Sequence, residues 1–146
     1  MPASDSPTSI RTPREVFERL AAGISAGEWE GLAELYAEDV VVEIPLAIPA
    51  PMRIEGRKEV ARHFHDRIGL LKLRVLDQVV HETADPEVVI AEFTHQGEVL
   101  ATGRTWTSRN IQVLRVRDGL IVSSRDYHDH VQINQAFGRL PELLGG

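Results

Sequence analysis

Residues 115–130, RVRDGLIVSSRDYHDH, are the stretch from which the rest of the chain can be interpreted. Asp118-Gly119 lies between two strand-like runs, which is a strong signal for a β-hairpin with a two-residue turn. The second arm begins apolar at Leu120–Val122 and becomes polar over Arg125–His130. A strand with an apolar beginning and a titratable end suits the wall of a binding cavity. Asp126 is the predicted functional carboxylate.

The composition is that of an ordinary globular protein, with 146 residues, 42% hydrophobic and 26% charged. This length can bury a core without disulfides or a structural metal. The absence of cysteine excludes thiol nucleophiles and iron–sulfur clusters, and fits a cytoplasmic protein. The net charge of −6 argues against nucleic acid as a partner, and no apolar run is long enough for a membrane span. Residues 1–12 are expected to be a flexible tail before one domain at 13–146.

Three helices are predicted in the N-terminal half. Thr12 and Glu15 form a capping-box pattern, and apolar residues then recur at helical spacing over 13–26. A second short helix is expected over about 28–37. A third is expected over 57–67, where apolar residues again form one stripe.

The remaining segments predict strands and connections. The β-branched run 39–45 indicates the first strand, and the proline-rich segment 45–56 indicates an apolar loop, either packed on the core or rimming a cavity. Long strand-like runs follow from residue 70, and the tail predicts a short helical closure. The fold class is therefore α+β: a curved mixed or antiparallel sheet wrapped by three N-terminal helices into a cone-shaped barrel.

The order of these segments carries a family resemblance. Four motifs contribute to it: YAEDVVVEIP at 36–45, GRKEVARHF at 56–64, ADPEVVIAEFTHQG at 84–97 and RVRDGLIVSSRDYHD at 115–129. Together they resemble the SnoaL-like branch of the nuclear transport factor 2-like superfamily. This branch includes polyketide cyclases, limonene-epoxide hydrolase and phenazine-biosynthesis condensation proteins. The resemblance covers roughly residues 13–140 and implies a homodimer formed through the open face of the sheet.

Only some of the known site residues of these proteins have a counterpart in this sequence. Asp126 stands where epoxide hydrolases place a catalytic Asp and phenazine proteins a catalytic Glu. Phe93 and His95 stand where epoxide hydrolases have an Arg and a second Asp, so that reaction is not expected. Ile44 replaces the base of ketosteroid isomerases. His63 is the nearest match to the histidine of the phenazine proteins.

A carboxylate inside an apolar cone loses solvation, which suits a general acid or base. If the hairpin pairs in simple register, Asp126 lies opposite Ile111, and Arg115 and Arg117 share its face. The alternative is a structural Asp126 that pairs with Arg125 or Arg104 at a solvated edge.

Other side chains are predicted around Asp126. His95 and His63 are candidates to assist proton transfer. Arg104 pairs with Glu92 across strands or orients a substrate. The candidate pocket-lining aromatic residues, which can equally be core residues, are Trp106, Phe64, Tyr36 and Phe17.

The alternation of Asp126, His128 and His130 suggests a metal site, but three successive alternate positions span too far for one ion. No phosphate-binding loop or dinucleotide fingerprint is present. The sequence therefore favours a cofactor-independent acid/base enzyme, an isomerase, cyclase or dehydratase, acting on a small hydrophobic cyclic or polyketide-like metabolite. The alternative is a non-catalytic module that binds a small molecule or acts as a scaffold.

Overall fold

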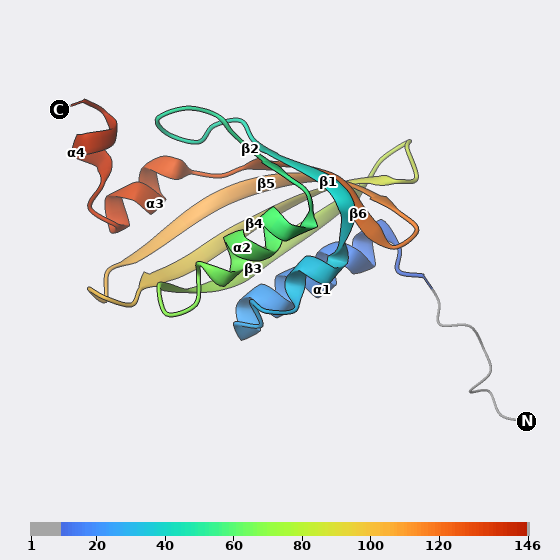
Figure 1. Ribbon diagram of the computed structural model, residues 1–146, viewed down its shortest axis with the longest axis horizontal. Helices are drawn as coiled ribbons and strands as arrows, with labels where there is room; N and C mark the ends of the chain where they lie inside the picture. The colour runs from blue at the N-terminus through green and yellow to red at the C-terminus, as the bar shows by residue number, and fades with distance from the viewer. Residues whose placement is uncertain (1–9, 146) are drawn as a thin grey trace, which may run out of the picture.

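The computed structural model describes residues 10–145, which build one curved six-stranded sheet with the strand order β2-β1-β6-β5-β4-β3 (Figure 1). The strands are β1 Tyr36–Ile44, β2 Met52–Glu55, β3 Leu71–Glu82, β4 Val88–Val99, β5 Thr105–Arg117 and β6 Leu120–Tyr127. Neighbouring strands are antiparallel except β1 and β6, which pair in parallel. The predicted α+β class with a curved mixed sheet is confirmed.

Helices α1 (Pro13–Ala26) and α2 (Arg57–His65) lie along one side of the sheet, and α3 (His130–Ala136) and α4 (Leu140–Leu143) lie at one of its ends (Figure 1). Helix α1 begins with the predicted capping box. Thr12 Oγ1 accepts from the Glu15 amide at 3.2 Å, and the Glu15 carboxylate accepts from the Thr12 amide at 2.8 Å. These bonds satisfy amides that would otherwise be unpaired in the first turn.

The core fills the space between α1 and the concave face of the sheet. Burial alternates strictly along most of β5, so one face of that strand packs inward and the other points to solvent. Residues with almost no exposed surface include Val16 and Phe17 of α1, Leu114 of β5 and Ile121 of β6.

Two sequence predictions need correction. The second helix expected over 28–37 is only a 3-10 turn, η2 (Leu32–Leu35), and Tyr36 already belongs to β1. Leu32, Leu35 and Tyr36 are all buried, so this apolar spacing reflects core contacts and does not require a longer helix. The expected loop at 45–56 also contains β2, which lies at the edge of the sheet where neighbouring prolines are tolerated.

The β5–β6 hairpin turns at Asp118-Gly119 as predicted, and both turn residues have positive φ, 53° and 77°. The predicted simple register is wrong beyond the turn. Pairing shifts by one residue, because Val116 faces Ile121 but Arg115 already faces Ser123. The extra residue on β6 is a β-bulge, and it places Asp126 opposite Gln112 instead of Ile111.

The bulge also changes the position of the two arginines. Arg115 and Arg117 lie on the outer face, opposite to that of Asp126. There Arg115 donates to Asp85 at 3.0 Å and to Glu87 at 2.9 Å. A simple register would place both arginines on the same face as Asp126, but in the structure they lie on the opposite face of the sheet.

Two further predictions concerned the N-terminal tail and membrane-spanning segments. Of the tail predicted at 1–12, residues 1–9 lie outside the described residues. Between residues 10 and 145, no helix has the length and apolar character needed to span a membrane.

Candidate active site

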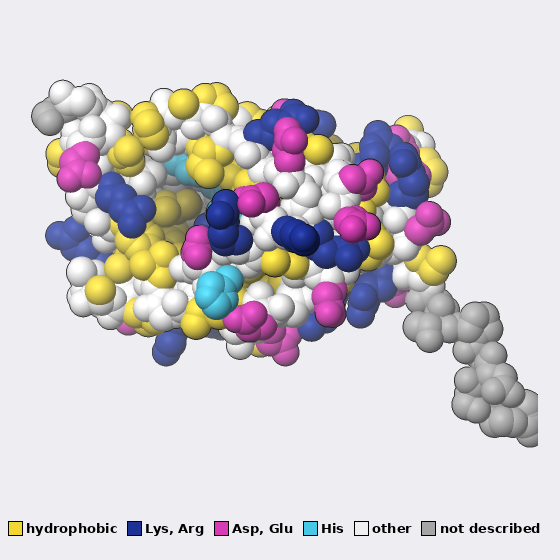
Figure 2. Space-filling model, viewed as in Figure 1, with side chains coloured by type: hydrophobic (Ala, Val, Ile, Leu, Met, Phe, Trp, Pro, Cys, Tyr) yellow, Lys and Arg dark blue, Asp and Glu magenta, His cyan; other side chains and the backbone are white. Residues whose placement is uncertain are grey.

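A cavity of about 380 Å³ lies between the concave face of the sheet and helices α1 and α2. Its opening is visible in Figure 2 as a hollow with hydrophobic side chains in its depth. This volume is in the range of small-molecule sites. The wall is mainly apolar, and its polar members include Tyr36, His63, Arg67, His95, Gln112, Asp126, His128 and His130.

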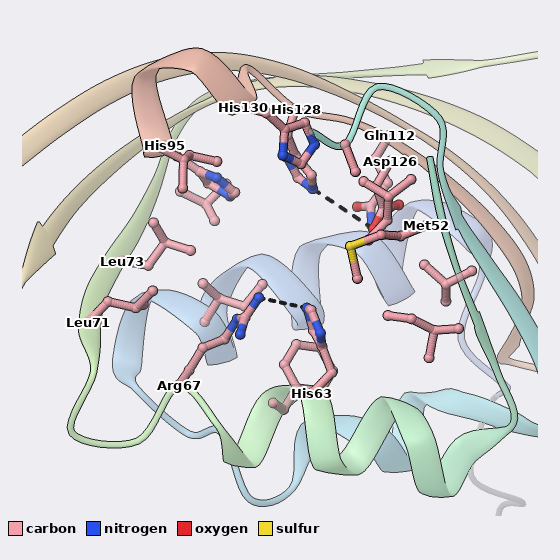
Figure 3. Close-up of a pocket in the computed structure, with 18 of the residues that line it drawn as sticks. Met52, His63, Arg67, Leu71, Leu73, His95, Gln112, Asp126, His128 and His130 are labelled. Atoms are coloured by element: carbon pink, nitrogen blue, oxygen red, sulfur yellow. Dashed lines mark hydrogen bonds and ion pairs between the residues drawn. The ribbon is translucent and has the colours of Figure 1, made fainter. Parts of the chain in front are cut away.

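Asp126, on β6, is held in this wall with only 15% of its side chain exposed. Two donors fix its Oδ1 atom: Gln112 Nε2 of β5 at 3.0 Å and the neighbouring Ser124 hydroxyl. The other oxygen, Oδ2, lies 3.9 Å from His128 Nε2 (Figure 3). One oxygen is therefore held in place, and the other remains on the side of His128 and the cavity.

The alternative of a structural Asp126 paired with Arg125 or Arg104 is wrong. Asp126 is largely buried, and its hydrogen bonds come from the neutral side chains Gln112 and Ser124. Within residues 10–145, no arginine forms an ion pair with it.

His128 follows β6 and stacks on His95 of β4, with ring centroids 5.5 Å apart and an interplanar angle of 19°. Strand β5 lies between β6 and β4, so the two stacked rings reach towards each other across β5. We expected His95 on a strand adjacent to that of Asp126, but its strand, β4, is the second one from β6. Burial, together with the nearby His128 and Arg67, lowers the pKa of His95 to about 3. Burial also lowers the pKa of His128, although the Asp126 carboxylate opposes this effect.

His63 enters the cavity from α2, on the side opposite to His128 (Figure 3). Its Nε2 atom lies 2.7 Å from Arg67 Nη2. A guanidinium can only donate, so Nε2 accepts and the proton of the neutral ring is on Nδ1. Burial and then the Arg67 charge lower the pKa of His63 to about 4. The other histidine of this helix, His65, is exposed and contacts Glu30.

Three buried nitrogens have no hydrogen-bond partner within the described part of the chain: Trp106 Nε1, His128 Nδ1 and His130 Nε2. All three belong to residues that line the cavity. Unpaired buried polar atoms are rare in folded proteins and call for an explanation, such as a water or a ligand. These three nitrogens are enclosed in the wall of the cavity and have no partner there among residues 10–145.

The predicted pocket-lining aromatic residues Trp106, Phe64, Tyr36 and Phe17 all lie in the cavity wall. Tyr36 is buried, and its pKa is raised by burial and further by the charge of Asp126. Its phenol therefore keeps its proton at neutral pH and is a potential hydrogen-bond donor.

Arg104 is placed differently from its prediction. It is exposed in the connection before β5 and does not line the cavity, so a direct contact with a molecule bound there is not supported. The expected pair between Arg104 and Glu92 is also wrong. Glu92 contacts His81 of β3 at 2.6 Å instead.

Sequence reasoning did not identify Arg67 and Gln112 as site residues, and it considered His128 and His130 only as metal ligands. Within residues 10–145, no three His, Asp or Glu side chains gather as a metal site would require. Arg67 had a usable signal, because it follows His63 by four residues, and in the helix predicted over 57–67 this spacing puts both side chains on one face, although α2 itself ends at His65. Gln112 could not be recognised without the bulge in β6.

Comparisons with known proteins agree with this architecture. The family model of the SnoaL-like domain matches residues 17–124. A PhzA/B-like protein of uncharacterised function from Pseudomonas aeruginosa is 34% identical over 126 residues, which are 86% of this chain and 89% of that protein. A crystal structure of a Bacillus subtilis protein, provisionally called an isomerase, is 32% identical with a TM-score of 0.81. That match covers 86% of this chain and 92% of the other.

More distant structures share the fold alone. A Pseudomonas putida protein provisionally called a polyketide cyclase is 23% identical, with a TM-score of 0.76 over 86% of this chain and 98% of that chain. A nuclear transport factor 2-like protein from Burkholderia xenovorans is 22% identical, with a TM-score of 0.67 over 88% of this chain and 98% of that chain. The fold is therefore shared with a nuclear transport factor 2-like protein. The chain belongs to the SnoaL-like family.

Proposed function

We propose that this protein is a small, cofactor-independent enzyme that transfers a proton on a hydrophobic, cyclic or polyketide-like molecule. The observation that carries this proposal is the buried Asp126, with one oxygen fixed by two donors and the other left on the cavity side. A carboxylate positioned in a mainly apolar cavity suits general acid or base catalysis. The fold alone hosts many functions, so the proposal depends on this site.

In the proposed reaction, Asp126 Oδ2 removes a proton from a carbon next to a carbonyl group. The protonated phenol of Tyr36 donates a hydrogen bond to the carbonyl oxygen, where negative charge develops. A neutral histidine, His95 or His63, assists as a second donor. Return of the proton from Asp126 to another carbon gives an isomerisation. Attack of the enolate carbon on a second carbonyl, whose oxygen then takes the proton from Asp126, gives a cyclisation. Departure of a hydroxyl group from the neighbouring carbon, protonated by Asp126 so that it leaves as water, gives a dehydration.

The test replaces Asp126 by Asn, which keeps the shape of the side chain and removes its basicity. Proton exchange at the carbon next to the carbonyl of 2-tetralone, a flat apolar ketone, can be followed in D2O by NMR. We expect Asp126→Asn to lower the exchange rate by roughly 100-fold or more, the usual contribution of a general base. Asp118→Asn is the matched control, because it makes the same chemical change at the hairpin turn, outside the cavity.

The same experiment separates the enzyme from a binding module of the same fold. Exchange that is equally fast in the wild type and in Asp126→Asn would contradict a catalytic role for this carboxylate. Ketones that bind measurably but exchange only at the buffer rate would favour the binding module. The open cavity argues against a scaffold filled by its own side chains, but it suits an enzyme and a binding module equally. The largely buried Asp126 in its wall, bound by Gln112 and Ser124, is what supports the enzyme.

A further inference from the structure

Arg67 is fixed at the junction between α2 and β3. Its amide donates to the Phe64 carbonyl at 3.0 Å, and its own carbonyl accepts from the amides of Leu70 and Leu71 at 3.0 and 3.3 Å. These bonds anchor the backbone in a tight turn. The side chain extends from this turn into the cavity, beside His63 (Figure 3).

Among residues 10–145, the guanidinium of Arg67 forms no ion pair, although the charge of its chain neighbour Asp66 acts on it from a greater distance. Within residues 10–145, no carboxylate lies within the 4.0 Å that defines an ion pair, and its one side-chain hydrogen bond goes to the neutral His63. Some surface arginines have such partners, since Arg115 and Arg117 bind Glu87 and Arg62 binds Glu59, but Arg67 differs from them in that its side chain lines the cavity. Burial lowers the pKa of Arg67, which reflects a cation partly removed from water.

A desolvated cation facing an apolar cavity is unfavourable unless a counter-charge compensates it. Asp126 does not supply that charge, since it lies on the β5–β6 wall and is bound by Gln112 and Ser124. A guanidinium has five donors and matches a carboxylate in two parallel hydrogen bonds. A single cation also balances one negative charge better than the two charges of a phosphate group.

We propose that the cavity binds molecules that combine a hydrophobic body with one carboxylate, and that Arg67 holds the carboxylate. The body then fills the apolar space of the cavity towards the sheet. This inference deepens the proposed function by naming its substrate class. It requires that the cavity is the binding site, but not that Asp126 catalyses a reaction.

The experiment compares two probes of nearly the same shape, 2-naphthoate and its neutral amide, 2-naphthamide. Binding to the full-length protein is measured by titration calorimetry, which needs no turnover. We expect the wild type to bind the carboxylate at least about tenfold more tightly than the amide, and Arg67→Gln to lose that preference. Arg67→Lys, which keeps the charge, should retain part of it. Arg62→Gln is the matched control, since it removes a cation from the exposed side of α2.

Several outcomes would overturn the proposal. One is equal affinity of the wild type for 2-naphthoate and 2-naphthamide. Another is a preference that survives in Arg67→Gln but disappears in Arg139→Gln, because Arg139 also borders the cavity. Failure of benzoate, 2-naphthoate and decanoate to bind at millimolar concentration would overturn it as well. Circular dichroism of each variant shows whether it is folded, and Arg67→Lys provides the test if Arg67→Gln is not.

The result is independent of the catalytic proposal. A carboxylate preference that depends on Arg67, found together with unchanged proton exchange in Asp126→Asn, would support the ligand class and contradict the enzyme. Loss of exchange in Asp126→Asn without any carboxylate preference would support the enzyme and contradict the ligand class.

Discussion

Asp126 shows how far single residues of the site could be predicted. Its position in the final strand and its titratable neighbours were visible in the sequence, and it does line the cavity. Its partner Gln112 was not predictable, because a bulge of one residue in β6 changes every pairing beyond it. The bulge allows Ile121 to be buried while Arg115 points to the outer face, so it depends on the packing of the whole sheet. The sequence of the turn does not encode it.

The buried histidines make stability depend on pH. His63 and His95 have pKa values lowered from 6.5 to about 4 and about 3. Between pH 6.5 and these values the unfolded chain binds protons that the folded chain does not, so the free energy of unfolding falls as the pH is lowered. Each histidine contributes a slope of up to about 1.4 kcal/mol per pH unit. Urea denaturation at pH 7, 6, 5 and 4 measures it.

The His95→Gln variant should lose its share of this slope, since glutamine does not titrate. His65→Gln provides the control, because His65 is exposed on the outside of the molecule. A pH slope that is the same in His95→Gln and in the wild type would show that His95 is not the buried neutral group described above.

Among the elements, those with strong local signals were predicted well. Helix α1 has its capping box, and the β5–β6 hairpin has its Asp-Gly turn. The helix predicted over 28–37 was wrong, because a few buried apolar residues fit a 3-10 turn followed by a strand as well as they fit a short helix. Strand β2 was missed because four residues between Pro51 and Gly56 give almost no local signal.

The pairing of β4 with β5 contains a close contact that can be tested. Gly97 faces Trp106 across the two strands, and an added Cβ would overlap the indole ring in the cavity wall. We therefore expect Gly97→Ala to destabilise the protein by about 1–3 kcal/mol, the usual effect of overpacking. Urea denaturation followed by circular dichroism measures the change. Gly31→Ala is the matched control, since nothing lies within 4 Å of its added Cβ; an equal loss in both would contradict the contact.

At the scale of the whole molecule, the family resemblance predicts that two copies of the chain contact each other through the outer face of the sheet. Within residues 10–145, no helix covers the middle of this face, and Val79 and Ile111 are 51% and 41% exposed on it. These two side chains lie on either side of Glu92, and exposed apolar side chains on an open sheet face can take part in an interface. The sequence could suggest this surface only by family resemblance, because a contact between two copies leaves no local pattern.

We expect a homodimer formed through this face. Light scattering at micromolar concentration should give twice the mass of the 146-residue chain, and Ile111→Glu should give the mass of one chain, because it places a charge in the apolar interface. Ile68→Glu is the matched control, since Ile68 is similarly exposed, at 48%, but lies beyond α2 and away from the outer face. A wild type that has the mass of a single chain would contradict the dimer.

Because β1 pairs in parallel with β6, the sheet cannot be fully formed until β6 is available. Strand β1 can pair with β2 as soon as residues 52–55 are made, but its other neighbour, β6, is available only after residues 121–127 have been synthesised. Contacts between such distant segments are slow to form and leave a strand edge open in the meantime. A chain emerging from the ribosome can therefore form α1 and the β3–β4 hairpin early. It acquires Asp126 and the cavity wall around it only in the last step of folding.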